Sequence, residues 1–454
     1  MNIGRPFFYS PIKTILNRQQ QLDLLKLAFP IILGNLSQMM LNIIDSAMVG
    51  HLSYKHLAAA SLVTNMIGLP YVLCIGFSVA ISPLIAELKG AKKPEFCGAL
   101  LNNAFYLNIT VAVLTSFLLY LFGDVIFHLG QDPEVAKLGL PYMNWMLWSI
   151  VPMTAFLSIK QFCDGLNFTK IPMILSLASI PLNALLNYLL IYGNYGFPKM
   201  ELVGAGVATF ITRIFIALFL GIYVLFHKRY QIYQLHNRNL NKSQLKKIIN
   251  LALPSAWQYV SEIGAFVVLG ILVGWFGATQ QAAHQVSLSV AALTFMVSIG
   301  LSSAGSIKVG EAYGMKDILL VRRIGISVLQ FSAIYGCICA VFFIIFRNQI
   351  PYLFTSDPEV IHHAALLFLF AAAFQLGDSI QAVGIGVLRG IQDVKFPTIY
   401  TTLCYWFVGI PVGYFLSVML NWQVSGVWTG FIVCLSSMAF LLYRRFLKIT
   451  SSFN

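Results

Sequence analysis

The chain has 454 residues, of which 58% are hydrophobic and only 10% are charged, whereas soluble globular chains contain about 25% charged residues. So few charged side chains cannot coat a soluble protein of this size, which excludes a soluble globular fold. The formal net charge of +13 would also suit a nucleic-acid-binding protein. We attribute it instead to basic loops on one side of a membrane and expect no nucleic-acid partner.

Twelve long apolar runs follow one another along the chain. Runs of about 20 residues match the length of a transmembrane α-helix, whereas barrel strands would be about 10 residues long with alternating polarity. The sequence therefore predicts an all-α integral membrane protein with twelve transmembrane helices. The predicted spans are 27–50, 57–86, 97–122, 139–163, 171–193, 203–226, 248–274, 281–310, 321–346, 363–388, 397–420 and 422–443.

Lysine and arginine residues are distributed unevenly between the two sides of these spans. Both terminal segments and every second loop are basic, while the opposite side carries only Lys55, Lys137, Lys199 and Arg347. Basic loops remain in the cytoplasm during membrane insertion. We therefore expect a multi-pass protein with an even number of spans and both termini in the cytoplasm.

The second half of the chain repeats the first half. When Phe29 is aligned with Leu253, the two segments match without a gap, and polar residues coincide as well as apolar ones. Hydrophobicity alone does not require proline, glycine and glutamate to coincide, so chance similarity between two apolar segments is the weaker explanation. The coinciding pairs include Pro30 with Pro254, Ser37 with Ser261, Gly50 with Gly274, Glu87 with Glu311, and Gly90 with Gly314.

An Asp-Pro-Glu-Val motif that begins at Asp132 recurs at Asp357, so the repeat continues beyond these segments. The sequence predicts two six-helix lobes, residues 1–226 and 248–454, joined by a basic cytoplasmic linker, residues 227–247. Because six is even, both lobes begin on the same side, which makes a parallel repeat related by a pseudo-two-fold axis along the membrane normal. Such duplicated bundles are typical of transporters whose substrate site lies between rocking lobes.

Three acidic residues, Asp45, Glu262 and Asp378, lie deep inside predicted spans. A charged side chain at the bilayer centre costs about 2.5–3.5 kcal/mol on insertion scales, so such residues face the bundle interior and usually serve a transport pathway. A structural ion pair is the alternative, with Arg213 as the main candidate partner. Because one arginine cannot neutralise three acids, we favour a functional role.

Glu262 and Asp378 can lie at a similar depth in the second lobe. Glu262 follows Pro254 by eight residues, and Asp378 precedes Leu388 by ten, which corresponds to about 12 Å and about 15 Å of helix. Two carboxylates in a low-dielectric cavity cannot both be ionised cheaply, so one takes a proton or both hold a cation. We assign both residues to a coupling-cation site and expect them to bind Na⁺ if the chain is sodium-coupled.

A separate polar site is predicted in the first lobe. Gln38 occupies the position of the second lobe's first-helix glutamate, and Asp45 follows it by two helical turns on one face. Asn183 and Asn187 share a face of another span, and Thr209 adds a hydroxyl. These oxygens can form a polar or cation site. Hydrogen bonding between helices remains the alternative for the asparagines.

The sequence contains no clear motif for a cofactor, a structural metal or catalysis. The seven cysteines are odd in number and lack metal-ligand spacing, so we interpret them as small core residues. The glycines of Gly204–Gly206 indicate close helix packing, because no phosphate-loop lysine follows them. We expect no catalytic residue and no cofactor besides Na⁺ or H⁺ as the coupling ion.

Several of these segments together carry a family resemblance. The sequence resembles the multidrug and toxin extrusion (MATE) family, in its bacterial NorM-type branch. The matching segments cover both lobes and nearly the whole chain in order. They are Pro30, Gln38, Asp45–Gly50, Asn183–Asn187 with the residues that follow, Val203–Thr209, the Ala-Ala-His-Gln stretch that ends at Gln285, and Gln375–Gly390.

The resemblance implies an inner-membrane antiporter that expels small organic cations in exchange for Na⁺ or H⁺. From the three deep acids in a duplicated bundle we expect this exchange to proceed by rocker-switch alternating access. Glu262 and Asp378 match the family's second-lobe cation site. Asn187 stands where some relatives have a carboxylate, so the first-lobe site is not expected to bind Na⁺ with the full negative charge. Phe374 stands where some relatives have a tyrosine one turn before the acid, so a hydroxyl ligand is expected to be missing from the second-lobe site. The residues that match the first-lobe polar site are Asp45, Asn183, Asn187 and Thr209, with Gln38 beside them.

Other functions remain open from the sequence. A lipid-linked saccharide flippase of the same superfamily would need several basic residues in the central cavity to bind pyrophosphate, and Arg213 alone is weak support. A major-facilitator transporter has the same six-plus-six plan but a different motif after the second span.

An intramembrane metalloprotease would contain His-Glu-x-x-His, which is absent here. A channel usually assembles from several subunits, whereas this chain forms its own cleft, so we expect a monomer in the lipid bilayer.

Overall fold

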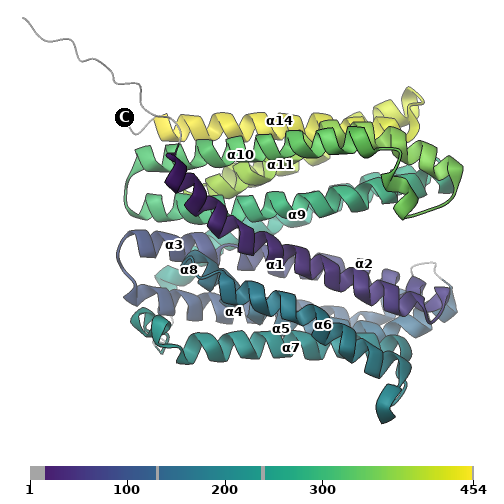
Figure 1. Cartoon of the computed structure of the whole chain (residues 1–454), viewed down its shortest axis with the longest axis horizontal. Helices are drawn as coiled ribbons and strands as arrows, with labels where there is room; N and C mark the ends of the chain where they lie inside the picture. The colour runs from purple at the N-terminus through teal and green to yellow at the C-terminus, as the bar shows by residue number, and fades with distance from the viewer. Residues whose placement is uncertain (1–15, 129–131, 237–240, 452–454) are drawn as a thin grey trace, which may run out of the picture.

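The chain folds into a bundle of α-helices (Figure 1). The computed structural model describes residues 16–128, 132–236 and 241–451. Within these ranges twelve helical segments are long and apolar enough to cross a membrane, which confirms the predicted number of spans. They are α1 (Arg18–Gly50), α2 with α3 (Tyr54–Ser78 and Ile81–Gly90), α4 (Glu95–Leu121), α5 (Pro133–Gly165), α6 (Lys170–Tyr192), α7 (Glu201–Phe226), α8 (Lys242–Gly274), α9 (Ala278–Gly314), α10 (Ile318–Phe346), α11 (Pro358–Gly390), α12 to η6 (Lys395–Met419) and α14 (Gln423–Ser451).

Several helices begin a few residues before the predicted spans, in polar sequence that a hydropathy criterion does not assign to a transmembrane helix. Helices α5 and α11 start at Pro133 and Pro358, five or six residues before the predicted spans. The side chains of Asp132 and Asp357 each accept a hydrogen bond from the backbone N–H two residues later. Aspartate is a favoured N-cap, and proline suits the first helical position because its φ angle is already helical. The repeated Asp-Pro-Glu-Val motif is therefore a helix start.

The predicted linker, residues 227–247, is partly folded. It contains a 3₁₀ segment, η3 (Lys228–Tyr233), which packs against α4 and α7 and buries Tyr230 and Tyr233. Helix α8 begins at Lys242, six residues before the predicted span, because Asn241 caps the backbone N–H groups of the first turn. Residues 237–240 of the linker lie outside the described ranges.

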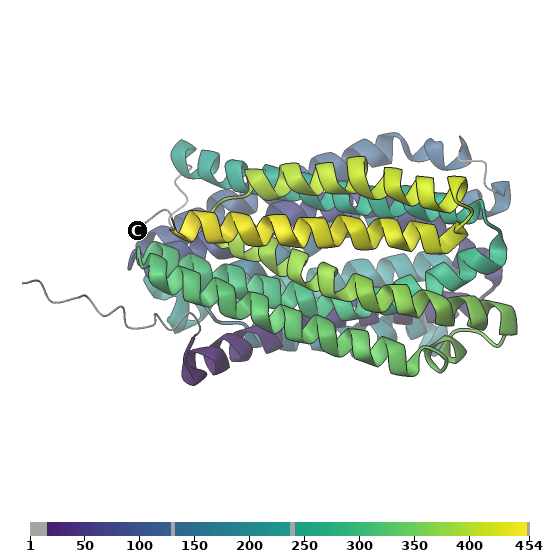
Figure 2. The same cartoon turned by 90° about the horizontal axis from the view of Figure 1, so that it is seen from above.

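The two halves of the bundle pack in the same way. In the first half α5 contacts α2, α4 and α7, and in the second half α11 contacts α9, α10 and α14. The first helix of each half also contacts the second span of the other half, since α1 packs against α9 and α8 packs against α2. Helix α1 starts and α14 finishes at the same end of the bundle (Figures 1 and 2). We call this end the terminal end.

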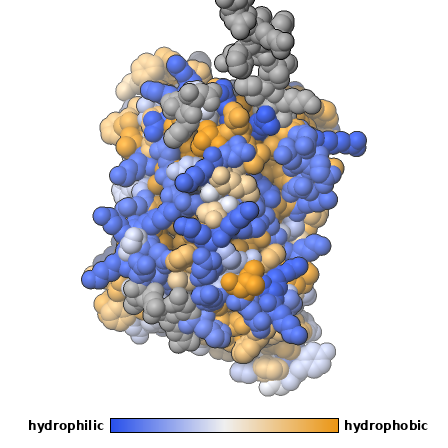
Figure 3. Space-filling model, turned by 90° about the vertical axis from the view of Figure 1, so that its left-hand side faces the viewer, coloured by the Kyte–Doolittle hydropathy of each residue, from blue (hydrophilic) through white to orange (hydrophobic). Residues whose placement is uncertain are grey.

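The surface of the bundle differs between its end and its sides. Hydrophilic side chains predominate where the terminal end faces the viewer in Figure 3. Lys92, Lys316 and Arg444 are exposed there, directly after α3, after α9 and near the end of α14. Many large apolar side chains elsewhere on the helices are also exposed. A water-facing end and apolar sides are what a membrane-spanning bundle requires.

Helices α3 and α9 cross at very short range near the terminal end. A Cβ atom on Gly90 would lie 2.0 Å from the backbone oxygen of Glu311, and a Cβ atom on Gly314 would lie 2.0 Å from the backbone oxygen of Glu87. The four residues are two pairs of the repeat, so the crossing is symmetric. Only glycine permits this approach of the two backbones. The crossing closes the two halves against each other at this end.

Side chains from the opposite half hold both glutamates of this crossing. Lys89 on α3 pairs with Glu311 at 2.9 Å, and Lys247 on α8 pairs with Glu87 at 2.6 Å. Gln392, which follows α11, donates a hydrogen bond of 2.6 Å to Glu87. Partly exposed ion pairs of this kind contribute little stability each. They therefore favour closure of the terminal end without making it irreversible.

We expect Gly314→Ala to separate α3 from α9 at the terminal end. The added Cβ atom would lie 2.0 Å from a backbone oxygen, and contacts below 3.0 Å are essentially never found, so the helices must move apart by about 1 Å or more. Spin labels on Cys residues introduced at Lys92 and Lys316 would report this change as a longer distance. Cys337 would first be replaced, because it is exposed and would also react with the spin label. The other six cysteines are buried and can remain.

Gly270→Ala on α8 is the matched control for this experiment. Gly270 is also helical, but an added Cβ atom there meets no atom within 4 Å. The distance between the labels should therefore stay at the wild-type value. An unchanged distance in Gly314→Ala as well would show that the crossing is not as tight as described.

Candidate functional site

The first candidate site joins helices α1, α6 and α7. The Asp45 carboxylate accepts a hydrogen bond of 2.6 Å from the Asn187 amide and one of 3.0 Å from the Thr209 hydroxyl. The same Asn187 nitrogen donates to the side-chain oxygen of Asn183 at 3.1 Å. The structure thus brings together four of the five residues predicted for the first-lobe site.

This cluster has oxygen atoms available for a ligand. Asn187 is fully buried, and its side-chain oxygen has no hydrogen-bond partner among the described residues. Asp45 is only half-buried, so its carboxylate can be reached from outside the helix packing. Carboxylate, amide and hydroxyl oxygens are the ligands that hard cations prefer. The donor set therefore fits a cation such as Na⁺.

Gln38 is the predicted member that the structure does not join to this cluster. No hydrogen bond connects it to Asp45 within the described residues, and its buried amide nitrogen has no partner there. Residues seven apart share a helix face, but they are separated along it by about 10 Å. A shared face therefore does not imply direct contact between the two side chains, and the inclusion of Gln38 in the site stays a prediction.

Arg213 lies one helical turn beyond Thr209 on α7. Its guanidinium donates a hydrogen bond of 2.7 Å to the Ser149 hydroxyl, and the guanidinium carbon Cζ lies 5.5 Å from the centre of the Tyr71 ring. The positive charge acts on Asp45, but no carboxylate lies within 4.0 Å of Arg213 in the described part of the chain. A direct structural ion pair between Arg213 and Asp45 is therefore excluded.

The second candidate site joins α8, α11 and the span between Lys395 and Met419. Glu262 on α8 is half-buried, and it accepts a hydrogen bond of 3.2 Å from the Tyr405 hydroxyl. Asp378 on α11 is only 3% exposed, and its charge and that of Glu262 act on each other. The two predicted acids therefore lie within electrostatic range of each other, although no hydrogen bond joins them, and a shared cation site stays a prediction.

Tyr405 was not predicted from the sequence as a site residue. It lies in η5 (Cys404–Gly409), a π-helical segment, and is fully buried. Such segments are rare and often occur at functional sites because they rotate side chains out of the regular helical order. The sequence signal that could have identified Tyr405 was a tyrosine inside an apolar span. Such tyrosines also occur in ordinary helix packing, so the signal is weak.

The second site has a hydroxyl group, but it does not come from the position of Phe374. Phe374 offers none and packs against the rings of Phe266, Trp428 and Phe431. The hydroxyl comes instead from Tyr405, on a different helix. The second site therefore still contains two carboxylates and one hydroxyl.

The two halves place their acids at positions that do not correspond. The repeat aligns Asp45 with Leu269 and Glu262 with Gln38, so neither acid has an acidic counterpart. Helix packing is shared between the halves, whereas the chemistry of the two sites is not.

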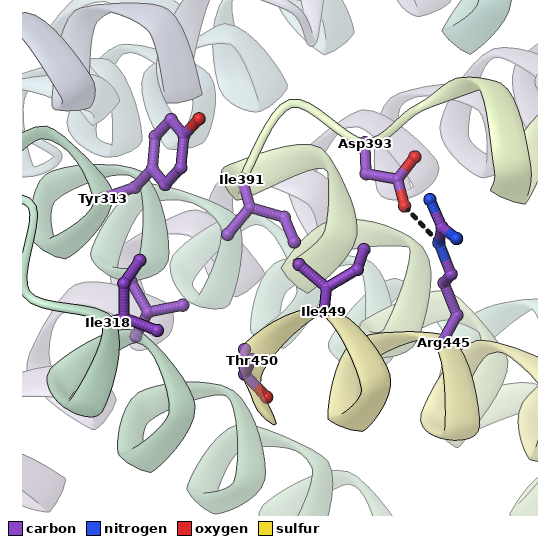
Figure 4. A pocket seen from close by; sticks show the side chains of 8 residues that line it. Tyr313, Ile318, Ile391, Asp393, Arg445, Ile449 and Thr450 are labelled. Atoms are coloured by element: carbon purple, nitrogen blue, oxygen red, sulfur yellow. Dashed lines mark hydrogen bonds and ion pairs between the residues drawn. The ribbon is translucent and has the colours of Figure 1, made fainter. Parts of the chain in front are cut away.

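Other possible sites lack these features. Within the described ranges no group of three or more His, Cys, Asp or Glu side chains could hold a metal ion. A cavity of about 400 Å³ opens near the end of α14 (Figure 4). Its acid and base, Asp393 and Arg445, pair with each other at 2.8 Å. None of the predicted site residues lines this cavity.

Comparison with known proteins adds to this description. The sequence profile of the MatE family matches residues 30–189 and again 254–415, which confirms the internal repeat. The chain is 33% identical to the multidrug resistance protein NorM of Aliivibrio fischeri over 433 residues, which cover 93% of this chain and 94% of that protein. It is 31% identical to the multidrug resistance protein MdtK of Yersinia pseudotuberculosis over 431 residues, with coverage of 93% and 94%.

The fold is also that of solved MATE structures. An outward-facing multidrug resistance MATE family transporter of the MOP superfamily superimposes with a TM-score of 0.88 at 19% sequence identity. The superposition covers 96% of this chain and 99% of the other. This similarity supports the helical architecture of both halves.

We expect Thr209→Val to destabilise the folded chain. The substitution keeps the shape of the side chain but leaves one Asp45 oxygen without its donor, which costs about 1–3 kcal/mol. Thermal or denaturant unfolding of the purified protein in detergent would measure the loss. Thr212→Val on the same helix is the control, because the Thr212 hydroxyl only bonds the backbone oxygen of Ala208. Equal stability of the two variants would contradict a hydrogen bond to Asp45.

Proposed function

The chain belongs to the MatE family, and from this premise we propose that it is a multidrug efflux transporter that exchanges small organic cations for Na⁺ or H⁺. Members of this family are transporters and not enzymes. Two relatives at 31–33% identity are named multidrug resistance proteins, and the coverage of both chains is nearly complete. The exchange of cations rests on the chemistry of the two candidate sites.

The observation that carries this proposal is a set of three deep carboxylates without a basic partner in contact. Asp45, Glu262 and Asp378 have no ion pair within 4.0 Å among the described residues. An ionised carboxylate in a membrane interior is costly unless it is compensated. Each acid is therefore most stable when it holds a proton, a metal cation or a cationic substrate. Competition among these ligands is the physical basis of antiport.

We place the terminal end in the cytoplasm of a bacterial inner membrane. The predicted cytoplasmic loops carry most of the basic residues, and basic loops remain on the cytoplasmic side. In this orientation the α3–α9 crossing closes the cytoplasmic side, so the described conformation would face outward. The glycine crossing and its partly exposed ion pairs are the elements that must separate when the two lobes rock to face inward.

Loss of either acid of the second site should abolish export. We expect Glu262→Gln and Asp378→Asn to reduce ethidium transport in everted membrane vesicles to the background rate, because neither amide can exchange a proton or neutralise a cation. Asp124→Asn is the control, since Asp124 is exposed at the end of α4 and belongs to neither site. Membrane protein levels should be equal in all variants. Normal ethidium transport by both site variants would disprove the second-lobe coupling site.

Ethidium should move against its own gradient when an ion gradient is imposed. We expect everted vesicles to accumulate ethidium under a Na⁺ gradient, a proton gradient or both, because ion binding and drug binding compete for the same carboxylates. A protonophore separates the two cases, since it leaves direct Na⁺ coupling intact and abolishes proton coupling. Transport that only follows the ethidium gradient would indicate a channel and contradict the proposal.

A further inference from the structure

A small polar cavity lies next to Glu262, between α8, α9 and α11. Its volume is about 30 Å³, which is enough for about two water molecules. Gln258, Ser302, Gln381 and Arg389 line it together with Glu262. Apart from Glu262, none of these residues was predicted as part of a site from the sequence.

On α11 the cavity is lined by residues between Gln381 and Arg389, and Asp378 lies one helical turn before Gln381. Asp378, Gln381, Ile385 and Arg389 are spaced by three or four residues, so they form one stripe on the helix. The stripe is about 16 Å long. Because α11 ends at Gly390, Arg389 is the member nearest the terminal end.

Two side chains on this stripe are buried without partners. Gln381 is fully buried, and neither its amide nitrogen nor its amide oxygen has a hydrogen-bond partner among the described residues. Arg389 is 6% exposed, and its Nε has no partner there either. Buried polar groups in folded proteins nearly always have partners, often ordered water. The lining is therefore suited to water or a hydrated cation.

No carboxylate lies within 4.0 Å of the Arg389 guanidinium in the described part of the chain, so its charge is not neutralised by direct contact there. Its guanidinium lies over the Tyr259 ring at 5.8 Å and acts electrostatically on Glu262. In the first half, the repeat aligns Arg389 with Asp164, which pairs with Lys160 at 2.9 Å. Corresponding positions thus carry a neutralised pair in one half and a free positive charge in the other.

From this cavity, and resting on the proposed function, we infer that Arg389 is an electrostatic seal on a water-accessible passage between Glu262 and the terminal end. A fixed guanidinium in a narrow, low-dielectric passage repels both metal cations and protons, as charged barriers do in membrane pores. The seal stops the coupling ion from crossing the second lobe without drug. Ion movement is then restricted to the rocking of the two lobes.

The test is ion leak in proteoliposomes that contain no drug. An imposed membrane potential would drive Na⁺ or H⁺ inward, and internal Na⁺-sensitive and pH-sensitive dyes would record the flux. We expect wild type to be nearly as tight as protein-free liposomes. Arg389→Gln should raise the leak at least about tenfold, because it removes the repulsive charge. Arg389→Lys keeps the charge and should stay tight.

A second pair of variants leaves Arg389 in place. Ser303 also lines the cavity, and Ser303→Asp would add a carboxylate that neutralises the guanidinium. Ser303→Asp should therefore leak, whereas Ser303→Asn, which has nearly the same size but no charge, should not. This pair tests the inference even if Arg389→Gln does not fold.

The outcomes distinguish this inference from the proposed function. If wild type fails to exchange ethidium for either ion in the same vesicles, the proposed function fails whatever the leak. If wild type exchanges ethidium but the neutralised variants, Arg389→Gln and Ser303→Asp, remain as tight as wild type, only the electrostatic seal is overturned. Equal leak in Ser303→Asp and Ser303→Asn would also overturn it, because size and not charge would then control the passage.

Discussion

The cost of an unpaired carboxylate inside a membrane is the constraint on which the rest of this structure depends. Asp45, Glu262 and Asp378 lie deep in helices whose other side chains are largely apolar, and no basic residue contacts them among the described residues. Hydrogen-bond donors such as Thr209 and Tyr405 lower this cost but cannot remove it. A bound proton or cation would complete the site, and this is the physical basis on which we propose ion exchange.

In the duplicated bundle the crossing between the halves is symmetric, whereas the acids of the candidate sites are not. The glycine crossing is symmetric, since Gly90 and Gly314 each approach the backbone of the other half. The acids are not symmetric, because Asp45 corresponds to Leu269 in the repeat. A symmetric crossing can open and close without favouring either half. The candidate sites, in contrast, differ between the two lobes, because the acids of one lobe have no acidic counterpart in the other.

Most of the fold and part of the candidate sites could be predicted from the sequence. Residues on one helix are related by fixed spacing, so the shared face of Asn183 and Asn187 was predicted correctly, and both contribute to the cluster around Asp45. Gln38 does not join Asp45 although both lie on α1, because seven residues span about 10 Å of helix. Contacts between different helices were harder to predict. Tyr405 reaches Glu262 from a π-helical segment, and this contact does not follow from spacing because it depends on helix rotation and local helix geometry.

The sequence by itself determined the twelve spans, the internal repeat and the positions of the deep acids, because hydropathy, residue identity and charge are properties of the chain. Tertiary structure alone decided that Lys247 pairs with Glu87 and that Lys89 pairs with Glu311 across the two halves. It also decided that Arg389 lines the cavity beside Glu262. The physical reason is that these partners lie on different helices, and the rotation and crossing of packed helices decide which of their side chains meet.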